Sequence, residues 1–304
     1  MMDGSVFDNM RALWCSPDSP LSLLFIFLWG SLWGSFINVC IYRLPLSRSI
    51  VFPGSSCPSC GQPILWWQNI PLLSYLMLGA KCHYCYRHIS WRYPLIELLT
   101  ACLSVFLFRY YGGFTLEYVY YFIFTGLLIV IFFIDLDHWL ILDCVSIPGT
   151  IAGVVGSFFV HKSNTAAALY ASFFQNPPRL SAAGWNVADA LAGIAIGYLT
   201  FSCIAFFGAL LLRQEAMGGG DVKFAGLIGA FLGGEWALVA FVVSFFLGSF
   251  YAVPLLIVRM KKKKDPVPFG TFMALAAFIT LIWGDRLLAA VCELQSMLFF
   301  GSSM

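Results

Sequence analysis

Long apolar stretches, separated by short polar segments, run along most of the chain and predict a bundle of membrane-crossing helices. A helix needs about 20 mainly apolar residues to cross a bilayer. Eight segments have this apolar character, although the sixth is too short to cross alone and is predicted to be a re-entrant or packed half-helix. The predicted helices cover residues 21–44, 94–108, 118–134, 144–160, 187–212, 222–233, 236–258 and 269–300.

The composition supports the same fold class. Hydrophobic residues make up 60% of the 304 residues and charged residues 11%, which is far from the balance of a soluble domain. We therefore predict an all-α polytopic membrane protein with about eight transmembrane helices. Its predicted parts are an N-terminal tail (1–20), the first transmembrane helix (21–44), a polar loop domain (45–93) and a membrane domain (94–300).

The distribution of lysine and arginine predicts the orientation. Of the 17 such residues, 12 lie in or beside the loops on the side that contains residues 45–93, and 5 lie on the other side. Because these residues are retained on the cytoplasmic side, the 45–93 loop is predicted to face the cytoplasm, in a plasma or inner membrane. The four lysines at 261–264 are interpreted as a topology signal that contacts anionic lipid headgroups, rather than nucleic acid.

Two pairs of cysteines in the 45–93 loop carry the clearest chemistry. Each pair has the spacing Cys-x-x-Cys. Thiolate pairs at this spacing, joined by a loop of this size, form tetrahedral structural zinc sites. A disulfide is the weaker interpretation, because the predicted compartment is reducing. The predicted zinc ligands are Cys57, Cys60, Cys82 and Cys85.

A run of three glycines ending in an acid lies between two strongly apolar segments. Glycine leaves room for another backbone to approach, so an extended peptide or a neighbouring helix could come close to Asp221. Ionisable residues at membrane depth are costly, and they mark proton relays, ion paths or catalysis. Asp221 is therefore a candidate functional residue, and a partner carboxylate is expected.

Three further acids lie on the same predicted membrane face: Asp135, Asp137 and Asp143. On a helix, positions 135 and 137 project about 200° apart, so only one of them can face Asp221. Asp135 is the deeper and hence the more costly to bury, which makes it the better candidate. Asp137 and Asp143 are interpreted as solvated loop acids that help to place the helix ends.

Two carboxylates held close in a poorly solvated site share a proton, because both cannot ionise. One can then act as a base on water while the other donates a proton to a carbonyl, which is the apparatus of an aspartic peptidase. A proton-coupled transporter also needs intramembrane acids and is the alternative. The sequence shows no internal repeat to support a transporter.

These motifs resemble those of the bifunctional type IV prepilin peptidases with N-methyltransferase activity. The resemblance extends from Gly34 to about Trp283. It combines a first-helix signature, the paired cysteines, the start of the second helix, two aspartate motifs and a proline-phenylalanine-glycine sequence near the last helix. The matching segments are 34–39 with 43–45, 57–60 with 82–85, 92–97, 135–138, 217–223 and 268–270.

The resemblance implies an eight-helix aspartic peptidase of the glycine-x-glycine-aspartate type, with Asp135 and Asp221 as its catalytic pair. It implies cleavage of the leader peptide of type IV prepilins and type II secretion pseudopilins, at the cytoplasmic face of the bacterial inner membrane. It further implies methyl transfer from S-adenosylmethionine to the new N-terminal residue, with the cysteine loop as the methyltransferase region. The residues themselves contain no glycine fingerprint for a nucleotide that would support this second activity.

Three positions depart from the pattern of that family. Leu142 stands where proline usually precedes the aspartate, Thr271 stands where a second proline is common, and Ala80 stands where glycine often precedes the basic residue and the cysteine. None of these positions is Asp135 or Asp221. The change at Ala80 bears on methyl transfer more than on the peptidase.

Overall fold

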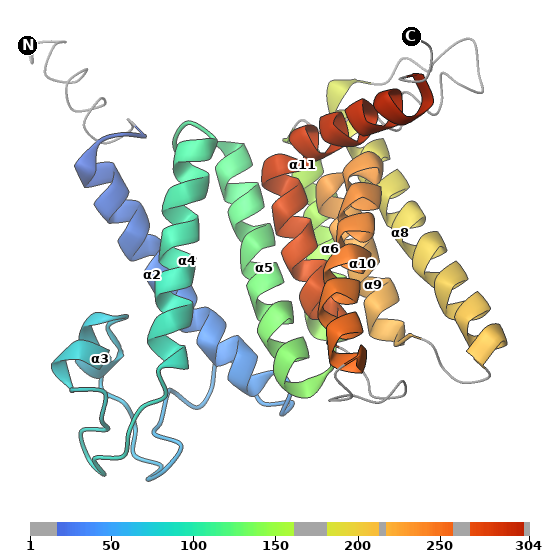
Figure 1. Ribbon diagram of the computed structural model, residues 1–304. Coiled ribbons are helices and arrows are strands. Elements are labelled where there is room, and N and C mark those ends of the chain that lie inside the picture. The colour runs from blue at the N-terminus through green and yellow to red at the C-terminus, as the bar shows by residue number, and fades with distance from the viewer. Residues whose placement is uncertain (1–16, 161–180, 213–216, 258–267, 301–304) are drawn as a thin grey trace, which may run out of the picture. The chain divides into compact units, whose positions relative to one another are not determined.

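A computed structural model describes residues 17–160, 181–212, 217–257 and 268–300 of the chain (Figure 1). The described residues form helices and two isolated β-bridges but no strand, which confirms the all-α prediction. Two short elements, η1 (Trp66–Asn69) and α3 (Leu73–Met77), lie in the loop after the first long helix. The long helices are α2 (Pro20–Arg43), α4 (Arg92–Tyr110), α5 (Leu116–His138), α6 (Asp143–Ser157), α8 (Ala182–Leu212), α9 (Gly219–Leu232), α10 (Gly234–Ile257) and α11 (Phe269–Phe300).

The predicted apolar segments correspond one to one with these long helices. Among the described residues, six helices are long and apolar enough to cross a membrane, namely α2, α4, α5, α8, α10 and α11. The other two, α6 and α9, have 15 and 14 residues. The sequence predicts a helix as far as residue 160, whereas α6 already ends at Ser157, where the chain turns. Residues 1–16 of the predicted tail and the four lysines at 261–264 lie outside the described residues.

The chain divides into two compact units, Met1–Gly126 and Leu127–Met304, and α5 contributes to both. In the first unit, α2 packs against α4. A Cβ atom added at Gly34 would lie 2.6 Å from Glu97 Cα, and one added at Gly30 would lie 2.8 Å from Ala101 Cα. The two helix backbones therefore approach as closely as small residues allow in membrane helices.

Polar residues near the end of α2 hold the segments that follow it. Asn38 Nδ2 donates a hydrogen bond to the carbonyl oxygen of Tyr93 at 3.0 Å. The Arg43 guanidinium donates to the carbonyl oxygens of Ser49 and Gly54, each at 3.0 Å. The end of α2 thereby fixes both the start of α4 and the first part of the cysteine loop.

In the second unit, the short helix α9 is surrounded by longer helices. It packs against α6, α8, α10 and α11, and all of its residues from 224 to 232 are buried. A helix of 14 residues is stable in this position because neighbouring helices, rather than lipid, cover it. The packed short helix that the sequence predicts around Asp221 is therefore present.

Glycines let α8 and α9 meet backbone to backbone. Gly193 of α8 and Gly229 of α9 face each other so closely that a Cβ atom on either one would overlap the carbonyl group of the other. One turn further along α8, a Cβ atom at Gly197 would lie 2.5 Å from the carbonyl oxygen of Ala225. Because backbone atoms cannot move aside as a flexible side chain can, these contacts require glycine.

We expect Gly229→Ala to destabilise the protein by about 2 kcal/mol or more, because the added methyl group pushes α9 away from α8. Gly248→Ala in α10 is the matched control, since its Cβ atom would make only ordinary contacts, with the rings of Phe269 at 3.6 Å and Phe272 at 3.7 Å. That change should be neutral or stabilising by up to about 1 kcal/mol, because alanine favours helix. Unfolding of both purified variants in detergent tests this, and equal stabilities would contradict it.

Candidate active site

Asp135 lies in the last turn of α5 and is almost completely buried, with 4% of its surface exposed. Its Oδ2 atom accepts the backbone N–H of Thr271 at 2.7 Å and the hydroxyl of Thr271 at 3.0 Å. Thr271 is the third residue of α11, where the N–H groups have no partner within the helix. The positive end of α11 thus faces the carboxylate and offsets part of the cost of burying its charge.

The residue before Thr271 must be small for this contact to form. A Cβ atom at Gly270 would lie 3.1 Å from both Cγ and Oδ2 of Asp135, and 2.8 Å from Cδ1 of Ile141. Any larger residue would therefore press on the carboxylate. This is a physical reason for glycine in the proline-phenylalanine-glycine segment at the start of α11.

Asp221 lies in the first turn of α9, where its N–H donates to the carbonyl oxygen of Gly218 at 3.1 Å. Burial raises the pKa of Asp221 from its ordinary value of 3.8 to about 6, and the negative charge of Asp135 acts in the same direction. A separate hydrogen bond, which the Asp221 carboxylate accepts from the backbone of Gly218, opposes this rise in pKa. The two carboxylates are therefore near enough for the charge of one to affect the ionisation of the other.

The three glycines before Asp221 have different surroundings. A Cβ atom at Gly220 would lie 2.9 Å from Ile141 Cβ and 3.1 Å from the carbonyl oxygen of Ile141, so this glycine packs tightly. A Cβ atom at Gly219 would meet no atom within 4 Å, and both Gly218 and Gly219 are exposed. Gly220 is therefore packed against Ile141, whereas Gly218 and Gly219 leave open space near Asp221.

The connection between α5 and α6 places Ile141 between the two glycine-containing segments. Trp139 adopts a positive φ of 55°, and its N–H donates to the carbonyl oxygen of Asp135 at 2.9 Å, so the chain turns sharply at the end of α5. Ile141 is then buried against Gly220 and Gly270. The side chain that separates the two segments thus sets the spacing at the Asp135 and Asp221 site.

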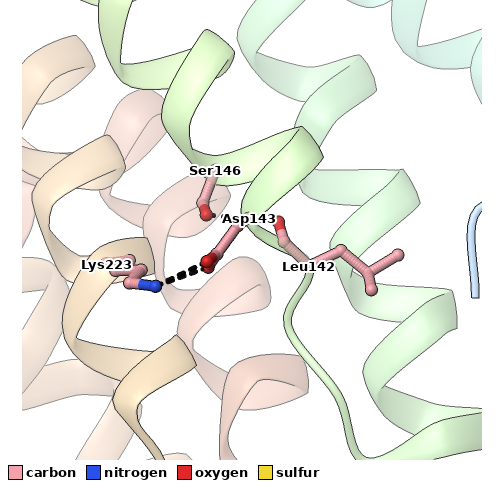
Figure 2. Close-up of polar contacts among 4 residues, drawn as sticks. All are labelled: Leu142, Asp143, Ser146 and Lys223. Atoms are coloured by element: carbon pink, nitrogen blue, oxygen red, sulfur yellow. Dashed lines mark hydrogen bonds and ion pairs between the residues drawn. The ribbon is translucent and has the colours of Figure 1, made fainter.

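Asp143 and Lys223 form an ion pair beside this site (Figure 2). Lys223 Nζ lies 2.7 Å from Oδ1 and 2.6 Å from Oδ2 of Asp143, so it bridges both carboxylate oxygens. Asp143 is in the first turn of α6, and Lys223 follows Asp221 by two residues in α9. The pair therefore ties the start of α6 to the turn of α9 that carries Asp221.

The sequence alone does not predict this ion pair. The side chains of Lys223 and Asp143 remain 37% and 55% exposed, so Asp143 is partly solvated as expected, but it is not a simple loop acid. At this exposure an ion pair adds at most about 1 kcal/mol of stability, which leaves positioning as its main effect. Asp137 and His138 are exposed, and Asp135 is the buried acid of the pair at 135 and 137.

The four cysteines of the loop lie together in the first unit. Their Sγ atoms all lie within 4.8 Å of one another, and the Sγ atoms of Cys57 and Cys85 are 3.9 Å apart. The two halves repeat the same turn, since Cys57 N–H donates to Gln62 O and Cys82 N–H donates to Arg87 O, each at 2.9 Å. All four are free cysteines, so the structure contains the cluster rather than the alternative disulfides.

The donor set of this cluster fits a zinc ion. Four sulfurs at about 2.3 Å from a tetrahedral centre would be about 3.8 Å apart, close to the observed spacing. Burial raises the pKa of Cys57, but hydrogen bonds from the backbone of Cys60 and Ser59 outweigh it and lower the pKa to about 6. A backbone hydrogen bond lowers the pKa of Cys60, but burial and the neighbouring thiols outweigh it and raise that pKa, so the first thiolate of the cluster forms at Cys57. A thiolate that forms near neutral pH is suited to metal binding.

The fold and the site together define a multi-pass membrane protein with two interacting carboxylates at helix ends and a four-cysteine loop. Two family matches agree with this description. The bacterial peptidase A24 N-terminal domain matches residues 28–111, which include the cysteine loop. The type IV leader peptidase family matches residues 122–253, which include Asp135 and Asp221.

The chain belongs to the prepilin leader peptidase/N-methyltransferase family. It is 33% identical to the prepilin leader peptidase/N-methyltransferase of Pseudomonas aeruginosa, over 88% of this chain and 93% of that protein. It is 32% identical to the Aeromonas hydrophila protein of the same name, over 86% of this chain and 91% of the relative. The Myxococcus xanthus protein of that name is 40% identical over 70% of this chain, a match that spans only 57% of the relative. No solved structure matches the chain.

The raised pKa of Asp221 predicts that this residue lowers the stability of the fold. Ionising a group whose pKa rises on folding costs free energy, so the cost is complete above about pH 6, shrinks between pH 6 and 3.8, and vanishes below 3.8. Asp221→Asn should therefore stabilise the protein by up to about 3 kcal/mol at neutral pH, and it should not change the stability below pH 3.8. Thermal unfolding in detergent across this range measures the difference. The exposed Asp137→Asn is the control, and an Asp221→Asn variant less stable than the parent at neutral pH would refute the prediction.

Proposed function

We propose that this protein is an aspartic endopeptidase that cleaves the leader peptide of type IV prepilins and type II secretion pseudopilins, and that it methylates the new N-terminal residue. The observation that carries the proposal is that the segments bearing Asp135 and Asp221 pack around the same side chain, Ile141, inside the region that matches the type IV leader peptidase family. The names of the relatives, prepilin leader peptidase/N-methyltransferase, support the prepilin substrate and the second activity, whereas the pseudopilins rest on the resemblance of the motifs alone.

The surroundings of the two carboxylates suggest a role for each. Oδ2 of Asp135 already accepts two hydrogen bonds from Thr271, which suits an ionised carboxylate. Asp221 has a pKa of about 6 and lies beside the open glycines, so it is suited to hold the shared proton near a bound peptide. In this assignment Asp135 is the base and Asp221 the acid at the start of the reaction.

The proposed reaction uses one water molecule. Asp135 takes a proton from the water as the water oxygen attacks the scissile carbonyl carbon, while Asp221 donates its proton to the carbonyl oxygen. A neutral tetrahedral diol results. Asp135 then returns a proton to the amide nitrogen, the carbon–nitrogen bond breaks, and a diol hydroxyl gives its proton to Asp221. The products are a carboxylic acid and a new amine, and the shared proton is restored.

The open side of the glycine run provides a place for the substrate chain. Gly218 and Gly219 are exposed and carry no side chain, so an extended backbone can approach Asp221 from that side. A leader followed by an apolar helix would place its cleavage point at the end of the membrane-spanning segments, where both acids lie at helix ends.

The cysteine cluster is proposed to hold a structural zinc ion through Cys57, Cys60, Cys82 and Cys85, which would lock the two turns of the loop together. No residue is assigned to S-adenosylmethionine. Neither the sequence nor the described helices contain a glycine-rich strand-to-helix turn, so methyl transfer rests on the relatives alone.

The proposed location is the bacterial inner membrane, with the active site toward the cytoplasm. The excess of lysine and arginine in or beside the loops on one side supports this orientation. The alternative of a proton-coupled transporter receives no support from the family matches, both of which are to peptidase families.

Asp135→Asn and Asp221→Asn should each reduce leader cleavage by about a thousandfold or more, because an amide can neither act as the base nor share the proton. Purified protein is incubated with a prepilin and a labelled methyl donor, and the product is analysed by mass. This one measurement reports both leader loss and methyl addition.

Asp137→Asn is the control for that experiment, since this acid is only two residues from Asp135 but is exposed. It should retain cleavage within a few-fold of the parent. Normal processing by either Asp135→Asn or Asp221→Asn would contradict the assignment of these two residues as the catalytic pair.

Cys85→Ser should lower the zinc content of the purified protein from about one ion per chain to a small fraction of that, because the hydroxyl is a poor ligand for zinc. Cys102→Ser is the matched control, since Cys102 is an exposed cysteine on α4 and is not in the cluster. Elemental analysis measures both variants. Equal zinc in the two, or none in the parent protein, would contradict the assignment.

A further inference from the structure

The loop between α2 and α4 contains a long segment without charge. Residues 61–80 include no aspartate, glutamate, lysine, arginine or histidine, although they contain two tryptophans and five leucines. The following segment, 81–92, carries five basic or imidazole side chains, namely Lys81, His83, Arg87, His88 and Arg92. This boundary separates an apolar part of the loop from a basic part.

The short helix α3 in this uncharged segment exposes its apolar face, whereas a helix of a soluble domain buries that face. Leu73, Leu76 and Met77 occupy positions i, i+3 and i+4, so they share one face, and they are 50%, 75% and 66% exposed. The more polar Ser74 and Tyr75 are less exposed. In water this arrangement would leave the apolar face uncovered, so it needs an apolar environment outside the protein.

A hydrogen bond sets the depth of α3 along the membrane-spanning helix α4. The N–H of Leu72, directly before α3, donates to Oε2 of Glu97 at 2.8 Å. Glu97 lies six positions beyond Trp91, the residue that precedes α4, which corresponds to up to about 9 Å along the helix. Figure 1 shows α3 beside the first turns of α4.

With the membrane surface at the start of α4, this position corresponds to that of helices that lie in the plane of the surface, with their apolar face about 5–10 Å into the boundary between headgroups and acyl chains. Trp66 in η1 and Trp91 are 80% and 69% exposed, as expected of tryptophans at a membrane interface. The basic residues of 81–92 would then lie on the water side, where they suit anionic headgroups.

We infer that residues 66–77 form an interfacial anchor, in which the face made by Leu73, Leu76 and Met77 is inserted into the bilayer surface and holds the cysteine loop against the membrane. The occupant of this face is lipid, because the face is apolar and exposed, and the bond between Leu72 and Glu97 ties it to the first turns of the spanning helix α4. The inference does not depend on the peptidase activity.

The test uses the full-length protein in vesicles of anionic phospholipid, with and without brominated acyl chains. A fluorescent amino acid is introduced by nonsense suppression at position 76 in one protein and at position 86 in another. Leu76 and Tyr86 are 75% and 74% exposed, so the protein alone shields them equally, but only position 76 is expected in lipid. Leu24, 56% exposed in α2, is the position for a lipid-facing reference.

Quenching by the brominated chains should be at least about threefold stronger at position 76 than at 86, and should approach that at position 24. Equal and weak quenching at 76 and 86 would overturn the inference. So would a label at 76 that leaves water only when a prepilin peptide is added, because the face would then bind the substrate instead of lipid.

A second variant tests the bond that sets the depth. Glu97→Ala removes the acceptor of the Leu72 N–H, and quenching at position 76 should fall to about half while that at position 24 is unchanged. Glu97→Gln keeps an acceptor oxygen and should preserve the quenching. Full quenching at 76 in Glu97→Ala would show that this bond does not hold α3 in the bilayer.

Discussion

The contact between the Asp135 carboxylate and the start of α11 is the constraint on which the second unit depends. A buried acid needs hydrogen-bond donors, and the N–H and hydroxyl of Thr271 provide them at 2.7 and 3.0 Å. This contact joins the end of α5 to the start of α11, two points 136 positions apart in the sequence. Gly270 must be small to permit it, and Ile141 fills the space beside it. The same contacts therefore determine how the end of α5 packs on the start of α11 and how the Asp135 carboxylate is held.

The second element of the site depends on a helix that cannot cross a membrane alone. Because α9 is covered by four other helices, its first turn can hold Asp221 near Asp135 while its remaining turns are buried. The close contact of Gly193 with Gly229 and the bridge from Lys223 to Asp143 fix α9 on two different sides. Together these two contacts hold α9, and with it Asp221, in one position relative to α6 and α8.

The apolar segments were sufficient to predict the helices, because each is long enough for its hydrophobic character to decide its structure. The candidate pair could also be predicted, since an acid next to an apolar segment is costly and so stands out. The roles of Thr271 and Lys223 could not, because each depends on a partner 136 or 80 positions away that only the fold brings near. Leu142 shows why a departure from the family pattern need not change the structure: its φ of −86° is close to the range that proline would impose.

The three glycines before Asp221 differ in what they permit. Gly220 touches Ile141, so the architecture itself fixes the residue at that position. A Cβ atom added at Gly219 would meet no atom within 4 Å, so the fold would accept a methyl group there without adjustment. In a natural homologue, a larger residue at position 220 would therefore require the segment around Ile141 to move away from α9. A change at position 219 would instead leave the scaffold as it is and alter only the space left for a chain beside Asp221.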